Sequence, residues 1–161
     1  GQTRFSVPMP TLDHRIPPPL VGALVAAAMW GVYTLGPQLA LPSLLKVVVV
    51  ALLGVAGAAF DLSGLLAFRA SRTTINPLQP QRASALVVGG VYRFTRNPMY
   101  VGMALFLLAW AVYLSAVLPF LGPLLFALYI TRFQIQPEER VLKALFGAGY
   151  LAYAARVRRW L

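Results

Sequence analysis

The sequence predicts an all-α integral membrane protein with about four transmembrane helices. Of its 161 residues, 59% are hydrophobic and only 11% are charged, and its mean hydropathy is +0.72. Soluble domains carry about 25% charged residues, so this composition excludes an ordinary soluble fold. A chain of this length forms one compact unit, and we therefore expect a single membrane domain over residues 1–161.

The first two helices are predicted from uncharged stretches, because about 20 residues are needed to cross a hydrocarbon layer about 30 Å thick. Residues 20–41 contain no charge, and residues 47–68 contain only Asp61. The second stretch also has three glycines, which would let a neighbouring helix approach closely: Gly54, Gly57 and Gly64. Both stretches are predicted to cross the membrane.

The next uncharged stretch, residues 98–131, is too long for one crossing, because a helix of that length would reach about 50 Å. Turn-forming residues lie in its middle, namely Pro119, Gly122 and Pro123. We therefore expect a third helix over residues 98–116 and a fourth over residues 119–133, joined as a tight hairpin.

The polar parts are a connector over residues 69–97 and a tail over residues 137–161. Proline in a first turn and glycine just after a last turn predict a tail helix over residues 137–146 that ends at Gly147, followed by another over residues 150–160. Glu138 and Glu139 then occupy a first turn, where the helix dipole favours acids.

The basic residues predict the orientation, since lysine and arginine near membrane ends are retained on the cytoplasmic side. Only Lys46 falls on the opposite face. Four crossings therefore place the N-terminus, the connector and the tail in the cytoplasm. The formal net charge of +10 is explained by attraction to anionic lipid headgroups, so no nucleic-acid partner is expected.

Metal chemistry is not expected from this composition. The chain has no cysteine, and its one histidine is His14, near the N-terminus. A thiolate site is therefore excluded, and a histidine-built metal site is implausible.

The segment over residues 90–102 combines arginines with a signal for the start of a helix. Asn97 before Pro98 is typical of such a start, because the asparagine side chain can cap the helix and proline fits its first position. The free amide groups at a helix start attract anions. The alternative role for Arg96 is that of a membrane anchor at the level of the headgroups.

Several short motifs, in this order and spacing, resemble the isoprenylcysteine carboxyl methyltransferase and phospholipid methyltransferase superfamily. They cover roughly the C-terminal half of the chain and comprise Leu86-Val87, Gly90-Val91-Tyr92, the run from Arg96 to Gly102, Pro137-Glu138-Glu139, Phe146-Gly147, Tyr150 and Tyr153. The resemblance implies an S-adenosylmethionine site at the cytoplasmic ends of the last two helices, closed over by the connector and the helical tail.

By the same resemblance, the cofactor and its product S-adenosylhomocysteine would be held by ten residues: Ser84, Ala85, Leu86, Val87, Tyr92, Asn97, Pro98, Met99, Tyr100 and Glu138. The carboxylate of the cofactor suits a helix start, its ammonium and ribose suit Glu138, and its adenine and sulfonium suit tyrosine rings. The alternative for Tyr92 and Tyr100 is an aromatic belt at the membrane interface.

Methyl transfer from a sulfonium is an in-line displacement, so the protein must mainly align the two reactants and exclude water. An ionised carboxylate acceptor needs no general base. A protonated amine needs one, and the candidates are Glu139, Glu138 and Asp61. Asp61 lies about 12 Å inside the second helix, either as a functional group or as a buried hydrogen-bond partner for a neighbouring helix.

The chain departs from the carboxyl methyltransferase pattern at positions that concern the acceptor. Asn97 and Ser84 replace histidines common in that family. Gln134 stands where an arginine would grip a prenylcysteine carboxylate, and Arg132 is the nearest basic substitute, which makes it a candidate catalytic residue. The acceptor is thus a prenylcysteine-like carboxylate or a lipid headgroup. The competing functions are a membrane reductase with a related helical half and a non-catalytic scaffold or transporter.

Overall fold

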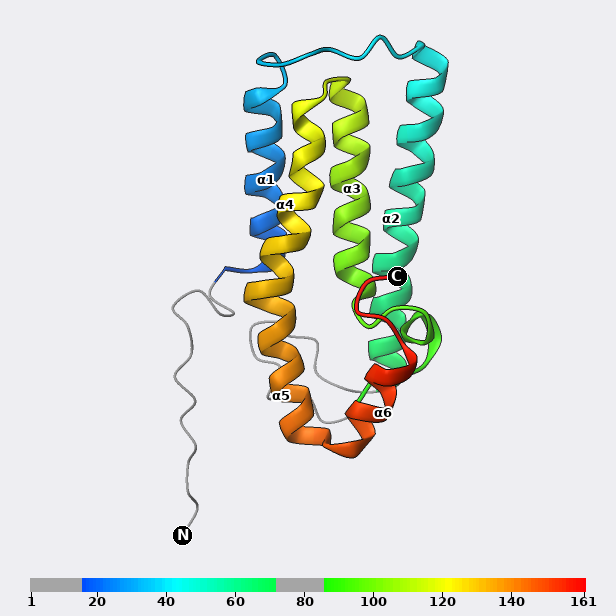
Figure 1. Ribbon diagram of the computed structural model, residues 1–161. Helices are drawn as coiled ribbons and strands as arrows, with labels where there is room; N and C mark the ends of the chain where they lie inside the picture. Colours follow the sequence, from blue (N-terminus) through cyan, green and yellow to red (C-terminus); the bar gives the residue numbers. More distant parts are fainter. Residues whose placement is uncertain (1–15, 72–85) are drawn as a thin grey trace.

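The computed structural model describes residues 16–71 and 86–161, and the regular elements within these ranges are all helical (Figure 1). The all-α prediction is therefore confirmed for this part of the chain. The α-helices are α1 (Pro18–Val32), α2 (Ser43–Ser71), α3 (Pro98–Leu114), α4 (Leu121–Ile130), α5 (Gln136–Phe146) and α6 (Ala148–Arg156). Three short elements join them: η2 (Gly90–Arg93), η3 (Leu118–Phe120) and η4 (Thr131–Ile135).

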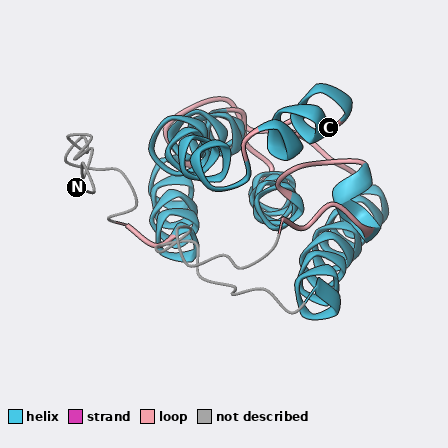
Figure 2. Cartoon of the chain, turned by 90° about the horizontal axis from the view of Figure 1, so that it is seen from below, coloured by secondary structure: helices cyan, strands magenta, loops and turns pink. Residues whose placement is uncertain are grey.

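The four longest apolar segments stand side by side in the order α1, α4, α3, α2. Seen along the bundle, α3 lies in the middle and α6 lies beside the end of the bundle (Figure 2). The core forms where α1, α3 and α4 meet, around the fully buried side chains of Ala111, Phe126 and Ile130. α2 packs against α3 and η2, so most of its apolar surface faces outward.

Two helical stretches are long and apolar enough to cross a membrane, Ser43–Ala70 with 28 residues and Leu118–Phe146 with 29. The other two apolar helices are shorter, with 15 residues in α1 and 17 in α3. α2 begins earlier and ends later than predicted. α1 ends at Val32, well before the predicted residue 41.

The chain after α1 is extended and closes over the hairpin between α3 and α4. The amide of Leu39 donates to the carbonyl of Ser115 at 2.8 Å, and the amide of Val117 donates to the carbonyl of Pro37 at 3.0 Å. Pro37 prevents the helix from continuing through the predicted residue 41, since proline disfavours the helical conformation of the residue before it. The predicted hairpin is confirmed, with its turn at Ser115, which adopts a left-handed φ of 53°.

The fourth helix does not stop near residue 133 as predicted, because α4, η4 and α5 are continuous. η4 is a π-helical turn that ends two residues before Pro137. Proline has no amide hydrogen, and its ring clashes with the carbonyl four residues earlier in an ordinary α-helix. A wider turn at this position relieves that clash. α5 is therefore a direct extension of α4 beyond the apolar part of the bundle.

The last helix is also shorter than predicted, because α6 ends at Arg156. Val157 has extended dihedral angles of −123° and 129°, and the chain then turns back toward the start of α3. There the amide of Arg96 donates to the carbonyl of Arg158 at 2.9 Å. The indole of Trp160, predicted to be helical, donates to the hydroxyl of Thr131 at 3.1 Å. The C-terminal residues thus form a return segment that covers the start of α3.

α2 and α3 approach most closely at Gly57 and Gly102, in agreement with the predicted role of glycines in α2. A β-carbon on Gly102 would lie 2.8 Å from the carbonyl oxygen of Gly57 and would collide with the carboxylate of Asp61. That carboxylate packs against the backbone of α3, where its Oδ1 is buried and has no hydrogen-bond partner among the described residues. Gly102 therefore makes room for both the helix crossing and the acid.

We expect Gly102→Ala to lower the free energy of unfolding by about 1–3 kcal/mol, the usual cost of overpacking a well-packed contact. The matched control is Gly54→Ala, also in the α2–α3 pair, because a β-carbon at Gly54 meets no atom within 4 Å. The thermal unfolding midpoint of both variants in the same detergent checks this. Equal midpoints would show that the glycine contact is not required.

Candidate functional site

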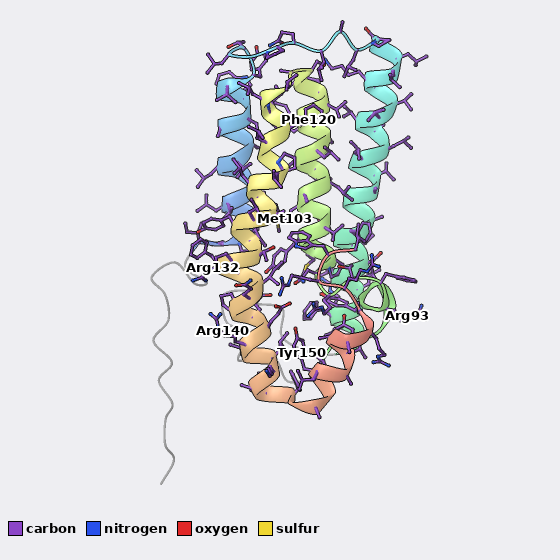
Figure 3. All side chains as sticks on the ribbon, viewed as in Figure 1. Arg93, Met103, Phe120, Arg132, Arg140 and Tyr150 are labelled. Carbon is purple, nitrogen blue, oxygen red and sulfur yellow. The ribbon has the colours of Figure 1, made fainter. Side chains whose placement is uncertain are left out.

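Polar and charged side chains gather at one end of the bundle, around α5, α6 and the start of α3 (Figure 3). The connector reaches this end through Tyr92, which is 6% exposed and packs its ring against the edge of the Phe68 ring at 5.5 Å. The hydroxyl of Tyr153 in α6 donates to the carbonyl of Tyr92 at 2.6 Å. Val87, Tyr150 and Val157 complete this buried cluster. The cluster fixes α6 against the end of α2.

The start of α3 is held by the return segment. The side-chain amide of Asn97 donates to the carbonyl of Arg159 at 2.8 Å, and the backbone amide of Asn97 donates to the hydroxyl of Thr95 at 3.2 Å. Pro98 occupies the first turn as predicted, but Asn97 does not cap the helix with its side chain. The prediction of a side-chain cap was wrong, because the carbonyl of Arg159 takes the asparagine amide.

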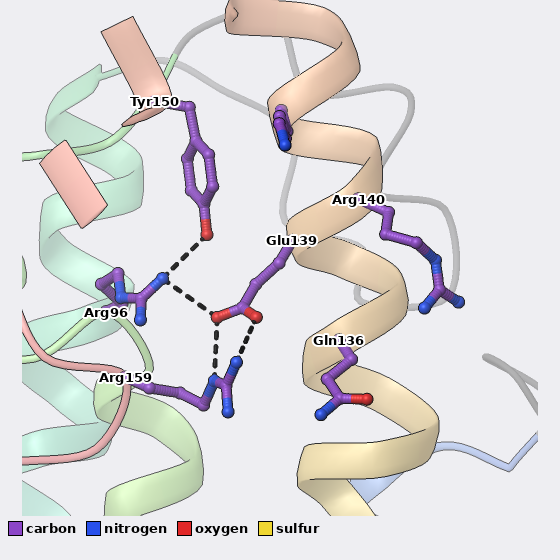
Figure 4. A pocket seen from close by; sticks show the side chains of 7 residues that line it. Arg96, Gln136, Glu139, Arg140, Tyr150 and Arg159 are labelled. Carbon is purple, nitrogen blue, oxygen red and sulfur yellow. Dashed lines mark hydrogen bonds and ion pairs between the residues drawn. The ribbon is translucent and has the colours of Figure 1, made fainter. Parts of the chain in front are cut away.

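Glu139 joins the start of α3 to the C-terminus (Figure 4). Its Oε2 accepts from Nη1 of Arg96 at 3.0 Å and from Nε of Arg159 at 3.0 Å, while its Oε1 accepts from Nη2 of Arg159 at 2.7 Å. Nη1 of Arg96 also donates to the hydroxyl of Tyr150 at 3.0 Å. Hydrogen bonds between ionised groups are about twice as strong as neutral ones. We call these four side chains the Glu139 clamp.

Glu138 is bound by neutral groups instead. Its Oε1 accepts from the hydroxyl of Tyr100 at 2.6 Å and from the side-chain amide of Gln134 at 2.6 Å. Tyr100 is 7% exposed and Gln134 is 2% exposed. In the described part of the chain, Oε2 of Glu138 has no hydrogen-bond partner. One oxygen of this carboxylate is therefore positioned by the protein and the other is open to a ligand.

The structure brings together several residues that the sequence analysis assigned to one site. Asn97, Tyr100, Glu138 and Glu139 meet where α3 begins and α5 leaves the bundle. Val87 and Tyr92 lie in the adjoining cluster with Tyr150 and Tyr153. Their roles in binding a cofactor stay predictions.

Other predicted site residues lie elsewhere. Pro98 and Met99 pack against α2, where a β-carbon on Gly64 would lie 3.2 Å and 3.1 Å from their side chains. The guanidinium of Arg132 lies over the ring of Phe133 at 5.0 Å. Leu86 is partly buried beside the tyrosine cluster, while Ser84 and Ala85 are outside the described residues.

A pocket of about 350 Å³ opens beside the Glu139 clamp, and it is lined by Arg96, Gln136, Glu139, Arg140, Lys143, Tyr150 and Arg159. Lys143 and Arg159 belong to the basic residues that the sequence analysis used only to predict the orientation in the membrane. The return segment after α6 places Arg159 in the site, and no local sequence pattern predicts such a reversal. Within residues 16–71 and 86–161, no cluster of three or more metal-ligating side chains occurs.

The protonation of this region follows from burial and from the clamp. Burial raises the pKa of Tyr92, Tyr150 and Tyr153, so these phenols are neutral at physiological pH. The hydrogen bond to Glu139 raises the pKa of Arg159. The hydroxyl of Tyr150 is thus neutral, and it accepts a hydrogen bond from Nη1 of Arg96.

A second, apolar cavity lies between α1 and α4. It measures about 490 Å³ and is lined by Ile16, Val21, Leu24, Val25, Leu125, Leu128, Tyr129 and Phe133. We call it the α1–α4 groove. The last of its lining residues along the chain is Phe133, three residues before Gln136 of the charged pocket. A helix rises about 4.5 Å over three residues, so apolar and cationic cavities follow one another along a single helix.

Comparison with known proteins identifies the chain. The family model described as phospholipid methyltransferase matches residues 45–149, about two thirds of the sequence. The chain belongs to the phospholipid methyltransferase family. The match runs from α2 into α6, and so includes both glutamates and the start of α3.

Sixty-three residues, or 39% of the chain, are 46% identical to the whole of an uncharacterized protein from Haemophilus influenzae. No solved structure matches the chain significantly.

We expect Glu139→Gln to destabilise the fold by about 2–3 kcal/mol, because it leaves Arg96 and Arg159 side by side without a counter-charge. Faster hydrogen exchange at the amide of Arg96, together with a lower thermal midpoint, would report the loosened return segment. Lys143→Gln removes one charge from the same helix and should change the midpoint little, since Lys143 is exposed. If the two variants behave alike, the clamp does not hold the return segment.

Proposed function

We propose that the protein transfers a methyl group from S-adenosylmethionine to an amphiphilic acceptor embedded in the membrane. Family membership supports the reaction class. The observation that carries the proposal is the meeting of two distant stretches, through the bond from Tyr100 to Glu138 and the ion pair between Arg96 and Glu139. These contacts build a polar site at the end of an apolar bundle, where a soluble cofactor and a lipid can meet.

The residues at this site fit the charge of the cofactor. When bound, S-adenosylmethionine supplies an electrophilic methyl group on a sulfonium. The free Oε2 of Glu138 offers a negative charge for the ammonium or sulfonium, and the ring of Tyr100 lies beside that carboxylate. We propose that the rest of the cofactor site is lined by Leu86, Val87, Tyr92 and Asn97. Backbone or apolar contacts to the cofactor are proposed for Ser84, Ala85, Pro98 and Met99.

Glu139 is better suited to positioning than to proton abstraction. Its carboxylate accepts three hydrogen bonds from two guanidiniums, which occupy most of its acceptor positions and leave little access for a substrate proton. We therefore propose that Glu139 orients Arg96 and Arg159. The reaction then uses an acceptor that needs no base from Glu139, such as a carboxylate or an amine that arrives neutral.

The α1–α4 groove is proposed to hold the apolar tail of the acceptor. Its lining is almost entirely aliphatic and aromatic, and its charged end lies within one helical turn of the cationic pocket. The guanidinium of Arg132 lies over the ring of Phe133, which lines this groove. We propose that Arg132 contacts the headgroup of the acceptor at the charged end of the groove. An acceptor in this groove would have its tail in the bilayer and its reactive group at the level of Glu138.

All four apolar segments are proposed to cross the membrane, with both termini in the cytoplasm. α1 and α3 alone reach about 22 Å and 25 Å, and both lie within the bundle formed with the two longer stretches. Lys46 lies near the end of α2 remote from the charged site, whereas Arg96, Arg140 and Arg159 surround that site. Anionic headgroups of the cytoplasmic leaflet would attract this charged end.

We expect Glu138→Gln to weaken binding of S-adenosylmethionine about tenfold while leaving the fold intact, because glutamine can still accept from Tyr100 but carries no charge. Calorimetric titration and the ligand-induced thermal shift measure this, and Lys46→Gln serves as a control for charge at the remote end. S-adenosylhomocysteine and NADPH are tested in parallel. Stabilisation by NADPH alone would instead indicate a reductase.

The absence of native cysteine allows a clean test of topology. We expect a cysteine at position 46 (Lys46→Cys) to react with a membrane-impermeant maleimide in intact cells. A cysteine at position 143 (Lys143→Cys) should react only after permeabilisation, because it lies beside the cytoplasmic pocket. Labelling of both from outside, or the reverse pattern, would refute the proposed orientation.

A further inference from the structure

The return segment, residues 157–161, crosses from the end of α6 over the start of α3 to η4 (Figure 1). On the α3 side, the carbonyl of Arg159 accepts from the side-chain amide of Asn97 at 2.8 Å. On the η4 side, the indole of Trp160 donates to the hydroxyl of Thr131 at 3.1 Å. The segment therefore bridges α3 and the continuous helix of α4, η4 and α5, between which the proposed cofactor site lies.

The proposed cofactor site beside this segment is nearly closed to solvent. Tyr100 and Gln134, whose side chains hold Glu138, are 7% and 2% exposed. Trp160 packs against the buried cluster that contains Tyr100. S-adenosylmethionine consists of a nucleoside and an amino acid joined at sulfur. A ligand of that size can be enclosed beside Glu138 only if a covering element first moves aside.

The burial of its residues indicates that the return segment is the element that moves. Val157 is 8% exposed and belongs to the buried cluster of Tyr150 and Tyr153, which holds α6 in place. Beyond Val157 the chain lies closer to water, because the side chain of Arg159 is 36% exposed and Leu161 is 61% exposed. Polar contacts near water contribute little net stability. Local opening after Val157 therefore costs much less than unfolding the core.

We propose that residues 158–161 form a gate, which opens about Val157 to admit S-adenosylmethionine and closes again over it. The hydrogen bond between Trp160 and Thr131 is the latch of this gate, and the Glu139 clamp supports it. The inference rests on the proposed function, because the gate serves the proposed cofactor site. Opening must precede both entry and exit of the cofactor, so a weaker latch speeds both.

The test uses the full-length purified protein in a neutral detergent, with S-adenosylmethionine as the ligand. The variant Trp160→Phe keeps an aromatic ring but removes the N–H donor of the latch. Surface plasmon resonance should show association and dissociation rate constants that are both about 2–10-fold higher, because the closed gate loses one hydrogen bond. The dissociation constant should change less than either rate constant. A residue that only supports the fold would not speed association.

A second variant removes the other half of the same bond. Thr131→Val deletes the acceptor hydroxyl with little change in side-chain volume, and it should raise both rate constants as Trp160→Phe does. Combining the two changes should add little to either one, because both remove a single interaction. Hydrogen exchange gives an independent measurement of opening. The amide of Arg96 donates to the carbonyl of Arg158 in the closed gate, so its exchange should be faster in both variants.

The matched control is Trp110→Phe, near the other end of α3. The indole of Trp110 donates to the carbonyl of Ala26 at 3.0 Å, and its ring is partly buried against the same core cluster as that of Trp160. This variant therefore removes an equivalent bond away from the gate. The rate constants for the cofactor and the exchange at Arg96 should stay as they are in the unchanged protein.

The outcomes separate the gate from the proposed function. Faster association and dissociation in both latch variants, with unchanged rates in the control, support the gate. Failure of the unchanged protein to bind S-adenosylmethionine would overturn the proposed function and the gate together. Normal binding with unchanged rate constants in both latch variants would overturn the gate alone. Faster dissociation without faster association would also overturn it, because the latch residues would then only support the bound cofactor.

Discussion

The charged end of the molecule depends on the ion pairs of Glu139 with Arg96 and Arg159. These residues come from three separate segments of the chain: the start of α3, the beginning of α5 and the chain after α6. Glu139 is 18% exposed, so its bonds are stronger than those of a surface pair while water still solvates part of the charge. Without this carboxylate, two arginines would repel one another at the point where the C-terminus must close.

The π-helical turn determines where that carboxylate lies. Because η4 absorbs the clash at Pro137, the helix continues from the apolar bundle into α5 without a hinge. Gln134 belongs to the turn itself and reaches Glu138 on the next turn at 2.6 Å. A break at this proline would have left both glutamates on a separate tail helix. Continuity gives them positions fixed by the packing of the bundle.

Features that depend on local chemistry were predictable from the sequence. The apolar stretches predicted the helices and their order, and Pro98 occupies the first turn of a helix as predicted. Glu138 and Glu139 instead lie within the continuous helix formed by α4, η4 and α5, so they are not at a free helix start. Features that depend on contacts between distant residues were not. The end of α6 and the reversal that brings Arg159 to Asn97 arise from hydrogen bonds across 62 positions of sequence. The extended chain after Val32 likewise forms because it closes over the α3–α4 turn.

Two adjacent glutamates produce opposite electrostatic environments on neighbouring faces of α5. Glu138 is bonded by neutral donors, Tyr100 and Gln134, so no opposite charge among the described residues pairs with it. Glu139 is bonded by two guanidiniums, so its charge is more than offset. The first arrangement favours a cation and the second an anion. The first turns of α5 therefore place an environment that favours a cation and one that favours an anion within one helical turn of each other.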